Sequence, residues 1–227
     1  MKSLDDIVDA LAEVDLPSVF NPYRNVCPIH DDAHSPDKRR KNVLRYFRAA
    51  QLAGVDTMWM GRDLGYRGGR RTGLPLTDEA NLASFSARYP GADPIKATVS
   101  APVFERTAAE IWAKILAVAF PPLLWNVFPY HPHSPDSEFD NRKFRSVELK
   151  QIHHINQALI SEMGIRRIIA IGRDAEQYAA GFDVEVHRIR HPSYGGISEF
   201  RSGLAMLYPE TKATKQRVLP GMDPLHA

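Results

Sequence analysis

Cysteine is nearly absent from the sequence, since Cys27 is the only one among 227 residues. One cysteine excludes an internal disulfide framework and a four-cysteine zinc or iron–sulfur site. Lack of disulfides is typical of a reducing compartment, and we expect a cytoplasmic protein. A chain of this length can bury about 70% of its unfolded surface, so its core needs neither a disulfide nor a metal.

Long apolar runs are lacking as well. The longest uncharged stretch, residues 115–130, has 16 residues and includes three prolines, whereas a helix that crosses a bilayer needs ~20 apolar residues. Residues 1–16 carry five acidic side chains and lack the basic start and apolar run of a signal peptide. We therefore expect no membrane partner.

An excess of charge of one sign is also missing, because 29 basic residues face 27 acidic ones and the net charge is +2. The basic residues are nevertheless clustered. Residues 38–48 include six basic and no acidic side chains, and residues 61–73 include four arginines and a single acid, Asp63. Such clusters are typical of a surface that binds a polyanion, or of a solvated basic face, and charge alone leaves both open.

Short apolar segments alternate with helical patterns along the chain. Strands are predicted over residues 55–60, 123–128, 167–171 and 184–189, and helices over 43–53, 107–120, 146–163, 174–180 and 198–208. This alternation predicts a three-layer α/β/α sandwich with a central, mainly parallel four-stranded sheet. We expect a single domain over residues 1–227, in which residues 1–40 form an irregular N-terminal arm after one short helix and residues 209–227 form a mobile tail.

Three of the predicted strands run into unusual loops. The first leads into Asp63 in a loop rich in glycine and arginine, the second ends in Asn126, and the fourth leads into His191. In open α/β sheets the ligand crevice lies outside the carboxyl ends of the strands, so these three residues should converge at one edge. A carboxylate can orient a water, an amide can read a donor–acceptor edge, and a histidine can donate to a developing oxyanion.

Each of these residues also has an ordinary structural interpretation. Asp63 could cap a turn or pair with Arg62 or Arg67, Asn126 could be a turn residue, and His191 could be structural. The functional interpretation therefore rests on the three together.

The three loops together resemble those of the uracil-DNA glycosylase superfamily. Gly61-Arg62-Asp63 resembles the opening of the water-activating motif, which the segment 72–76, Thr-Gly-Leu-Pro-Leu, closes. Leu123-Leu-Trp-Asn126 resembles the strand whose asparagine reads uracil, and His191-Pro-Ser193 resembles the start of the loop that enters the DNA minor groove. The resemblance covers roughly residues 40–208 and mixes features of the classical and single-strand-selective branches.

The resemblance implies a monofunctional DNA-repair glycosylase that flips uracil out of DNA and hydrolyses its N-glycosidic bond. It implies that Asp63 and His191 are catalytic, that Asn126 binds uracil, and that the backbone near Arg62 contacts its O2 atom. For phosphate contacts we expect Ser193, Arg70 and Arg71. Uracil-containing DNA would be the partner of a monomeric protein, associated with the nucleoid in a bacterium, and no cofactor or metal is implied.

The chain departs from the family pattern around the base. Gly65 stands where the classical branch has the tyrosine that excludes thymine, and Tyr66 follows one place later. Leu76 replaces the aromatic residue that stacks on the flipped base, so Phe128, Phe85 or Tyr66 would have to supply the stacking. Gly195 occupies the wedge position, which leaves Tyr194 as the bulky neighbour. The pocket should admit small C5 substituents if Tyr66 does not fill the space that Gly65 leaves, and should exclude them if the Tyr66 ring swings into it.

Two other functions remain open. Cys27, His30 and His34 lie within eight residues and could serve a metal-dependent hydrolase, with His131 and His133 as further ligands. A non-catalytic nucleic-acid-binding protein on the same scaffold would keep phosphate contacts but would not require Asp63.

Overall fold

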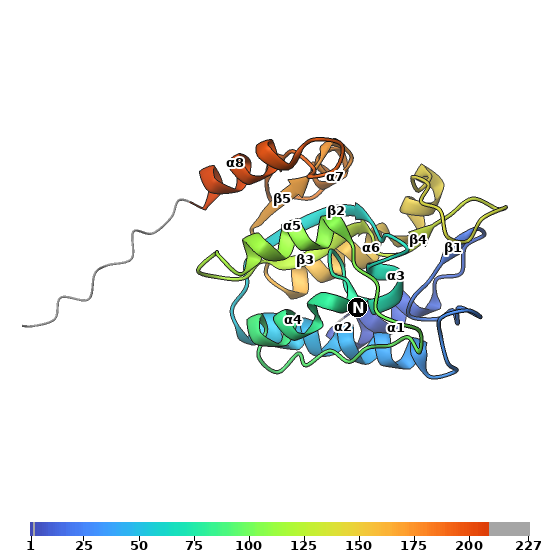
Figure 1. Cartoon of the computed structure of the whole chain (residues 1–227). Coiled ribbons are helices and arrows are strands. Elements are labelled where there is room, and N and C mark those ends of the chain that lie inside the picture. Colours follow the sequence, from blue (N-terminus) through green and yellow to red (C-terminus); the bar gives the residue numbers. More distant parts are fainter. Residues whose placement is uncertain (2, 209–227) are drawn as a thin grey trace, which may run out of the picture.

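The computed structural model describes residue 1 and residues 3–208 (Figure 1). Its main sheet has four strands, all parallel, in the order β3-β2-β5-β6. The strands are β2 (Thr57–Asp63), β3 (Leu123–Phe128), β5 (Arg167–Ile171) and β6 (Glu185–Ile189). All four predicted strands are therefore confirmed. The predicted tail over 209–227 lies outside the described residues.

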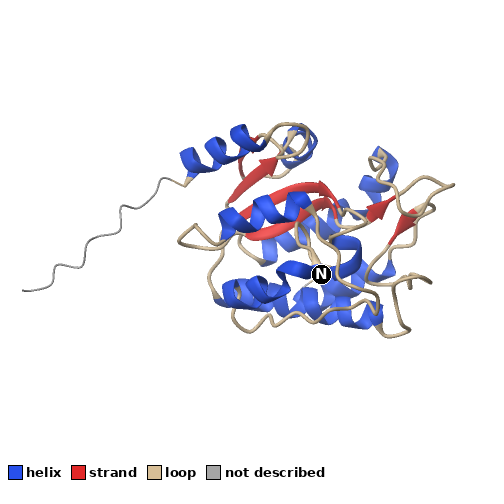
Figure 2. Ribbon diagram, in the orientation of Figure 1, coloured by secondary structure: helices blue, strands red, loops and turns tan. Residues whose placement is uncertain are grey.

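Helices cover both faces of this sheet, which gives the three-layer α/β/α sandwich that the sequence predicts (Figure 2). Five of them are predicted from the sequence, and one begins much earlier than expected. The helices that match predictions are α2 (Ser35–Leu52), α5 (Arg106–Ile115), α6 (Ser146–Glu162), α7 (Arg173–Ala179) and α8 (Ile197–Leu207). Shorter turns are added by α3 (Gly69–Thr72), η1 (Glu79–Asn81) and α4 (Leu82–Arg88).

The central strands are apolar because both of their faces are buried. Trp59 of β2, Trp125 of β3 and Ile169 of β5 have no exposed surface. Trp59 lies opposite both Leu124 and Ile169 in the sheet register. β6 is an edge strand, and its side chains are more exposed. The buried apolar residues form one continuous core.

The N-terminal segment starts with the expected short helix, but it belongs to the core and is not an irregular arm as far as residue 40. Helix α1 (Leu4–Glu13) is capped by Ser3 and buries Leu4, Ile7, Val8 and Leu11, which lie on one helical face. Strand β1 (Val19–Phe20) pairs antiparallel with β4 (His131–Pro132). The arm was expected to extend too far because α2 begins with polar residues, of which Ser35 and Arg39 are buried through hydrogen bonds.

The parallel direction of the strands places the ends of β2, β3, β5 and β6 at the same edge of the sheet. Four loops leave the sheet there, and they include residues 64–68, 129–130, 172 and 190–196. Within the described residues, no helix has the length and apolar character that crossing a membrane would require.

Candidate functional site

A cavity of about 640 Å³ lies at this carboxyl edge of the sheet. Its wall includes Asp63, Asn126 and His191, which the sequence analysis placed together although they are separated by more than 60 residues. Arg62, Gly65, Leu76, Ser193 and Tyr194 line the same cavity. The arrangement joins a carboxylate, an amide and an imidazole around a space of the size that small-molecule sites occupy.

Asp63 is the last residue of β2, and its carboxylate is only 9% exposed. Arg62 donates to both of its oxygens, from Nε to Oδ2 at 2.7 Å and from Nη2 to Oδ1 at 3.3 Å. Burial raises the pKa of Asp63, and the neighbouring Arg62 opposes this shift in part. The pairing with Arg62 that the sequence allowed is therefore present, and the pair itself lies on the cavity wall.

Asn126, a residue of the cavity wall, carries an unpaired acceptor. Its Nδ2 donates to the Asp63 carbonyl at 3.1 Å, whereas its buried Oδ1 has no hydrogen-bond partner among the described residues. A buried polar atom left without a partner costs about 1–3 kcal/mol. Gly61 permits this close packing, because a Cβ there would lie 2.7 Å from Asn126 Nδ2 and 2.8 Å from Leu76 Cδ2. A ligand that donates a hydrogen bond to Oδ1 would recover the cost.

His191 is neutral in this environment and has one defined tautomer. The Ser193 backbone N–H donates to His191 Nδ1 at 3.1 Å, so the proton of the neutral ring resides on Nε2. Burial, together with the charges of Arg62 and Arg190, lowers the pKa of His191 to about 4. The Nε2–H group is then a donor without a described partner on the wall of the cavity.

The loop after His191 carries an exposed aromatic residue at the mouth of the cavity. Tyr194 is 99% exposed, and its backbone has a φ of 53°, which is unusual for a residue other than glycine. Gly195 follows with a φ of 77°. Gly196 lies against the His191 carbonyl, with which any Cβ would collide. The local backbone therefore holds a bulky ring outward beside Ser193.

The aromatic residues proposed to stack on a base do not line the cavity. Phe128 is fully buried and packs against Tyr130 and Phe144 with ring centroids 5.2 Å apart in each case. Tyr66 lies beside His131, and its hydroxyl accepts a hydrogen bond from Arg67. The interpretation of Phe128 as a stacking residue is wrong, because its ring belongs to the hydrophobic core. Phe85 is likewise in the core.

Arg71 is also misplaced in the sequence analysis, because its side chain is 4% exposed. Its Nε donates to Glu79 Oε2 at 3.0 Å, and its Nη2 donates to Ser100 Oγ at 2.8 Å and to the Ala101 carbonyl at 3.0 Å. Arg71 therefore fixes the loop that contains Ser100 and cannot contact phosphates in this conformation.

Arg70 is buried to a similar extent, with 3% of its side chain exposed. Its guanidinium lies 4.0 Å from the ring centroid of Phe20 and 4.8 Å from that of Phe139, and it contacts His131 Nδ1 at 3.2 Å. Both arginines belong to the short helix α3, whose turn directs them inward. The prediction that Arg70 and Arg71 contact DNA phosphates, made from the run of arginines in a glycine-rich loop, is therefore not supported by their buried positions.

The cavity also contains residues that the sequence analysis missed. Glu105, Asn141, Arg173, Asp174 and Arg190 line it. Asp174 accepts from Lys143 at 2.5 Å and lies 3.6 Å from Arg62. Arg173 and Asp174 open α7 directly after β5, so strand-end reasoning could have found them. Glu105 precedes helix α5 and does not follow a strand, so its position in the sequence did not indicate that it lines the cavity.

The cluster of Cys27, His30 and His34 does not assemble a metal site. Throughout the described part of the chain, no group of three or more His, Cys, Asp or Glu side chains is placed to hold a metal ion. Cys27 is buried, whereas His34 lies on the surface at the start of α2. The ligand set that the metal-hydrolase alternative requires is therefore not formed.

The basic cluster over residues 38–48 is largely paired with acids. Lys38 bonds Asp32 at 2.7 Å, and Arg48 bonds Asp5 at 2.8 Å. Arg39, which is buried, pairs with the buried Asp31. Positive charge at the cavity comes instead from Arg62, Arg173 and Arg190.

Comparison with known proteins adds no assignment. No protein-family model matches the sequence, and no curated protein matches it. The function is therefore inferred from the geometry of the site.

Proposed function

We propose that the chain is a DNA-repair glycosylase that flips uracil out of DNA and hydrolyses its N-glycosidic bond, leaving an abasic site. The observation that carries the proposal is the cavity in which Asp63, Asn126 and His191 meet, with the Asn126 Oδ1 atom buried and unpaired. We expect the enzyme to act as a monomer on uracil-containing DNA, without a metal or cofactor. Flipping brings the scissile bond within reach of such a cavity.

Asn126 would select the base. Uracil carries a donor at N3 and an acceptor at O4, and these match the free Oδ1 and the second hydrogen of Nδ2. The first hydrogen of Nδ2 is already donated to the Asp63 carbonyl. Cytosine presents an acceptor and a donor in the same places, so two polar pairs would be mismatched. The buried position of Asn126, which is 1% exposed, makes such a mismatch expensive.

The remaining two groups would serve the chemical step. As the bond between C1′ and N1 breaks, its electrons pass to the base and the sugar becomes an oxocarbenium-like cation. The Asp63 carboxylate would stabilise this cation and orient a water, whose oxygen bonds to C1′ and whose proton passes to Asp63. His191 Nε2–H would donate to the uracil O2 as negative charge develops there, assisted by the backbone N–H near Arg62.

Tyr194 and Ser193 would contact the DNA around the flipped nucleotide. An exposed ring held outward at the cavity mouth can occupy the space that the base leaves. Arg62, Arg173 and Arg190 are the arginines of the cavity wall and replace Arg70 and Arg71 as candidates for phosphate contacts.

The test is base release from an oligonucleotide with one uracil, incubated with a chelator and then cleaved at abasic sites by alkali. We expect cleavage of this strand by the wild-type chain and much slower cleavage of a thymine control strand. Cleavage abolished by the chelator would favour the metal-dependent hydrolase. DNA retention without cleavage would favour the non-catalytic binding protein.

A further inference from the structure

Glu105 is an acid on the cavity wall that the proposed reaction does not use. It occupies the N-cap position of α5, yet its side chain does not cap the helix. Its backbone N–H donates to Asp78 Oδ2 at 2.7 Å. Its carboxyl group accepts no hydrogen bond from any described residue. The side chain is therefore held in place at its base while its polar end remains free.

Two glycines make room for this carboxyl group. A Cβ on Gly65 would lie 3.2 Å from Glu105 Oε1 and 3.5 Å from Oε2, and a Cβ on Gly68 would collide with Oε2. Gly65 itself lines the cavity. The carboxyl group thus lies over the glycine backbone and fills the space that a side chain at position 65 would otherwise occupy.

The Glu105 side chain is only partly buried, so the cost arises when a ligand covers its carboxyl group without bonding it. Burying a polar group without a hydrogen bond is unfavourable, and more so when it is charged. Burial and the nearby Asp78 raise the pKa of Glu105 to about 7, while Arg67 acts in the opposite direction. An acid that has no protein partner and faces a cavity is the kind of group that binds part of a substrate.

The contacts already assigned to the base indicate which part of the substrate Glu105 would meet. N1 carries the sugar, O2 would meet His191, and N3 with O4 would meet Asn126. Of the remaining ring positions, C6 lies beside the sugar, which leaves C5 for Glu105. We propose that Glu105 is a specificity-determining residue that accepts a hydrogen bond from a donor group on C5 of the flipped pyrimidine. This inference rests on the proposed glycosylase function.

The proposal defines a class of substrates. A C5 substituent with a hydroxyl or ammonium group would bond the carboxylate, whereas the methyl group of thymine would cover it without a hydrogen bond. Leaving that carboxyl group unpaired costs about 1–3 kcal/mol, or about 10- to 200-fold in rate. Unsubstituted uracil leaves room for a water beside Glu105. Thymine is thus rejected by a polar group and not by the bulk of an aromatic ring.

The test compares single-turnover release of four bases from otherwise identical strands: uracil, thymine, 5-hydroxymethyluracil and 5-aminomethyluracil. For each variant the readout is the rate of each substituted base divided by the rate of uracil. We expect the 5-aminomethyl ratio to exceed the thymine ratio by about tenfold or more in the wild type. Glu105→Gln should reduce this difference by about tenfold, because it removes the negative charge while keeping the size of the side chain.

Glu110→Gln is the matched control, since Glu110 lies on the same helix but pairs with Arg201 away from the cavity. It should leave all ratios unchanged. Should Glu105→Gln misfold, as judged by circular dichroism, Glu105→Asp provides a second test, because the shortened acid should also lower the aminomethyl ratio. Wild-type ratios that are equal for aminomethyluracil and thymine, or ratios that survive both Glu105 changes, would overturn the role of Glu105 alone. Failure of the wild type to release uracil would overturn the proposed function as well.

Discussion

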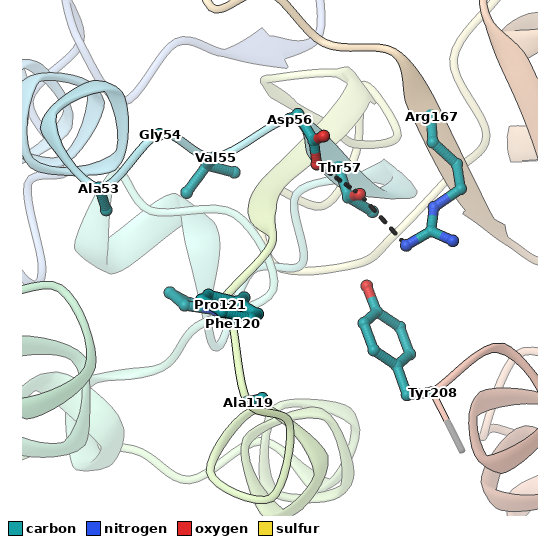
Figure 3. A pocket seen from close by; sticks show the side chains of 10 residues that line it. All are labelled: Ala53, Gly54, Val55, Asp56, Thr57, Ala119, Phe120, Pro121, Arg167 and Tyr208. Carbon is teal, nitrogen blue, oxygen red and sulfur yellow. Dashed lines mark hydrogen bonds between the residues drawn. The ribbon is translucent and has the colours of Figure 1, made fainter. Parts of the chain in front are cut away.

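The two edges of the central sheet each carry a cavity, but their polar groups are used differently. At the amino edge a cavity of about 410 Å³ is lined by Asp56, Thr57, Arg167 and Tyr208 (Figure 3). Thr57 donates to Asp56 at 3.0 Å and accepts from Arg167 at 3.3 Å. The Tyr208 hydroxyl accepts from Trp59 at 2.9 Å. Each of these four polar side chains therefore has at least one hydrogen-bond partner.

At the carboxyl edge the polar groups remain available. Asn126 Oδ1, the Glu105 carboxyl group and His191 Nε2 have no hydrogen-bond partner among the described residues. Both cavities are large enough for a small ligand, so size does not separate them. Unsatisfied hydrogen-bonding capacity does, since native proteins rarely leave it unused. These unpaired groups make the carboxyl edge the candidate ligand site.

The strongest test of this difference between the two edges replaces one aspartate at each of them, Asp63 at the end of β2 and Asp56 just before its start. Asp63→Asn should lower uracil release by about 10²-fold or more while folding and DNA binding persist, because the electrostatic and water-orienting role is lost. Asp56→Asn, just before β2, should change the rate by less than about twofold. Single-turnover cleavage by both proteins is the measurement. Near-wild-type turnover by folded Asp63→Asn would remove Asp63 from the mechanism.

A somewhat smaller effect is expected for His191→Ala, about 10- to 10²-fold on the chemical step. The negative charge on the base develops only as the bond breaks, so the rate should fall much more than the affinity for DNA. Single-turnover rates and DNA dissociation constants measured together provide the check. Equal losses in both would mean that His191 only positions its loop.

Acid should loosen the carboxyl edge before the amino edge. The pKa of His191 is lowered to about 4 in the folded protein, against 6.5 in the unfolded chain. Its contribution to stability is therefore present above pH 6.5 and is lost progressively as the pH falls towards 4. Hydrogen-exchange protection in residues 190–196 should drop by about 10²-fold across this window, since each unit of pKa shift corresponds to about tenfold. His191→Asn should remove this dependence, whereas protection around Asp56 and Thr57 should stay level in both proteins.

The smallest effect on DNA binding is expected for the buried arginines. Arg71→Ala should leave the salt dependence of DNA affinity unchanged, although breaking the buried pair with Glu79 costs about 3–5 kcal/mol of folding stability. Arg190→Ala should lower the salt slope by about one unit. Affinity measured over a range of salt concentrations, at a temperature where Arg71→Ala is folded, tests both. A reduced salt slope for Arg71→Ala would mean that Arg71 does contact DNA phosphates.

The sequence was most informative where a signal is local. Continuous apolar runs predict β2, β3 and β5, and the rule that parallel strands end at one edge predicts that Asp63, Asn126 and His191 meet. Failures arose where long-range packing decides. Arg70 and Arg71 point inward because each has buried partners there. Arg70 packs over the ring of Phe20, and Arg71 donates hydrogen bonds to Glu79 and Ser100. Glu105 reaches the cavity only because α5 is packed beside the loop that contains Gly65.

The hydrogen bond from Asn126 Nδ2 to the Asp63 carbonyl has a consequence for the accuracy of the proposed enzyme. A side-chain amide has nearly the same shape after a half turn, and a turned Asn126 would present the pattern that matches cytosine. The Asp63 carbonyl opposes that turn, because it would then face the amide oxygen. The orientation that rejects cytosine is thus imposed by the same residue whose carboxylate would direct the water. A substitution that displaced the end of β2 would therefore make the proposed enzyme both less selective and slower. The loss of selectivity would thus be accompanied by a lower rate of base release.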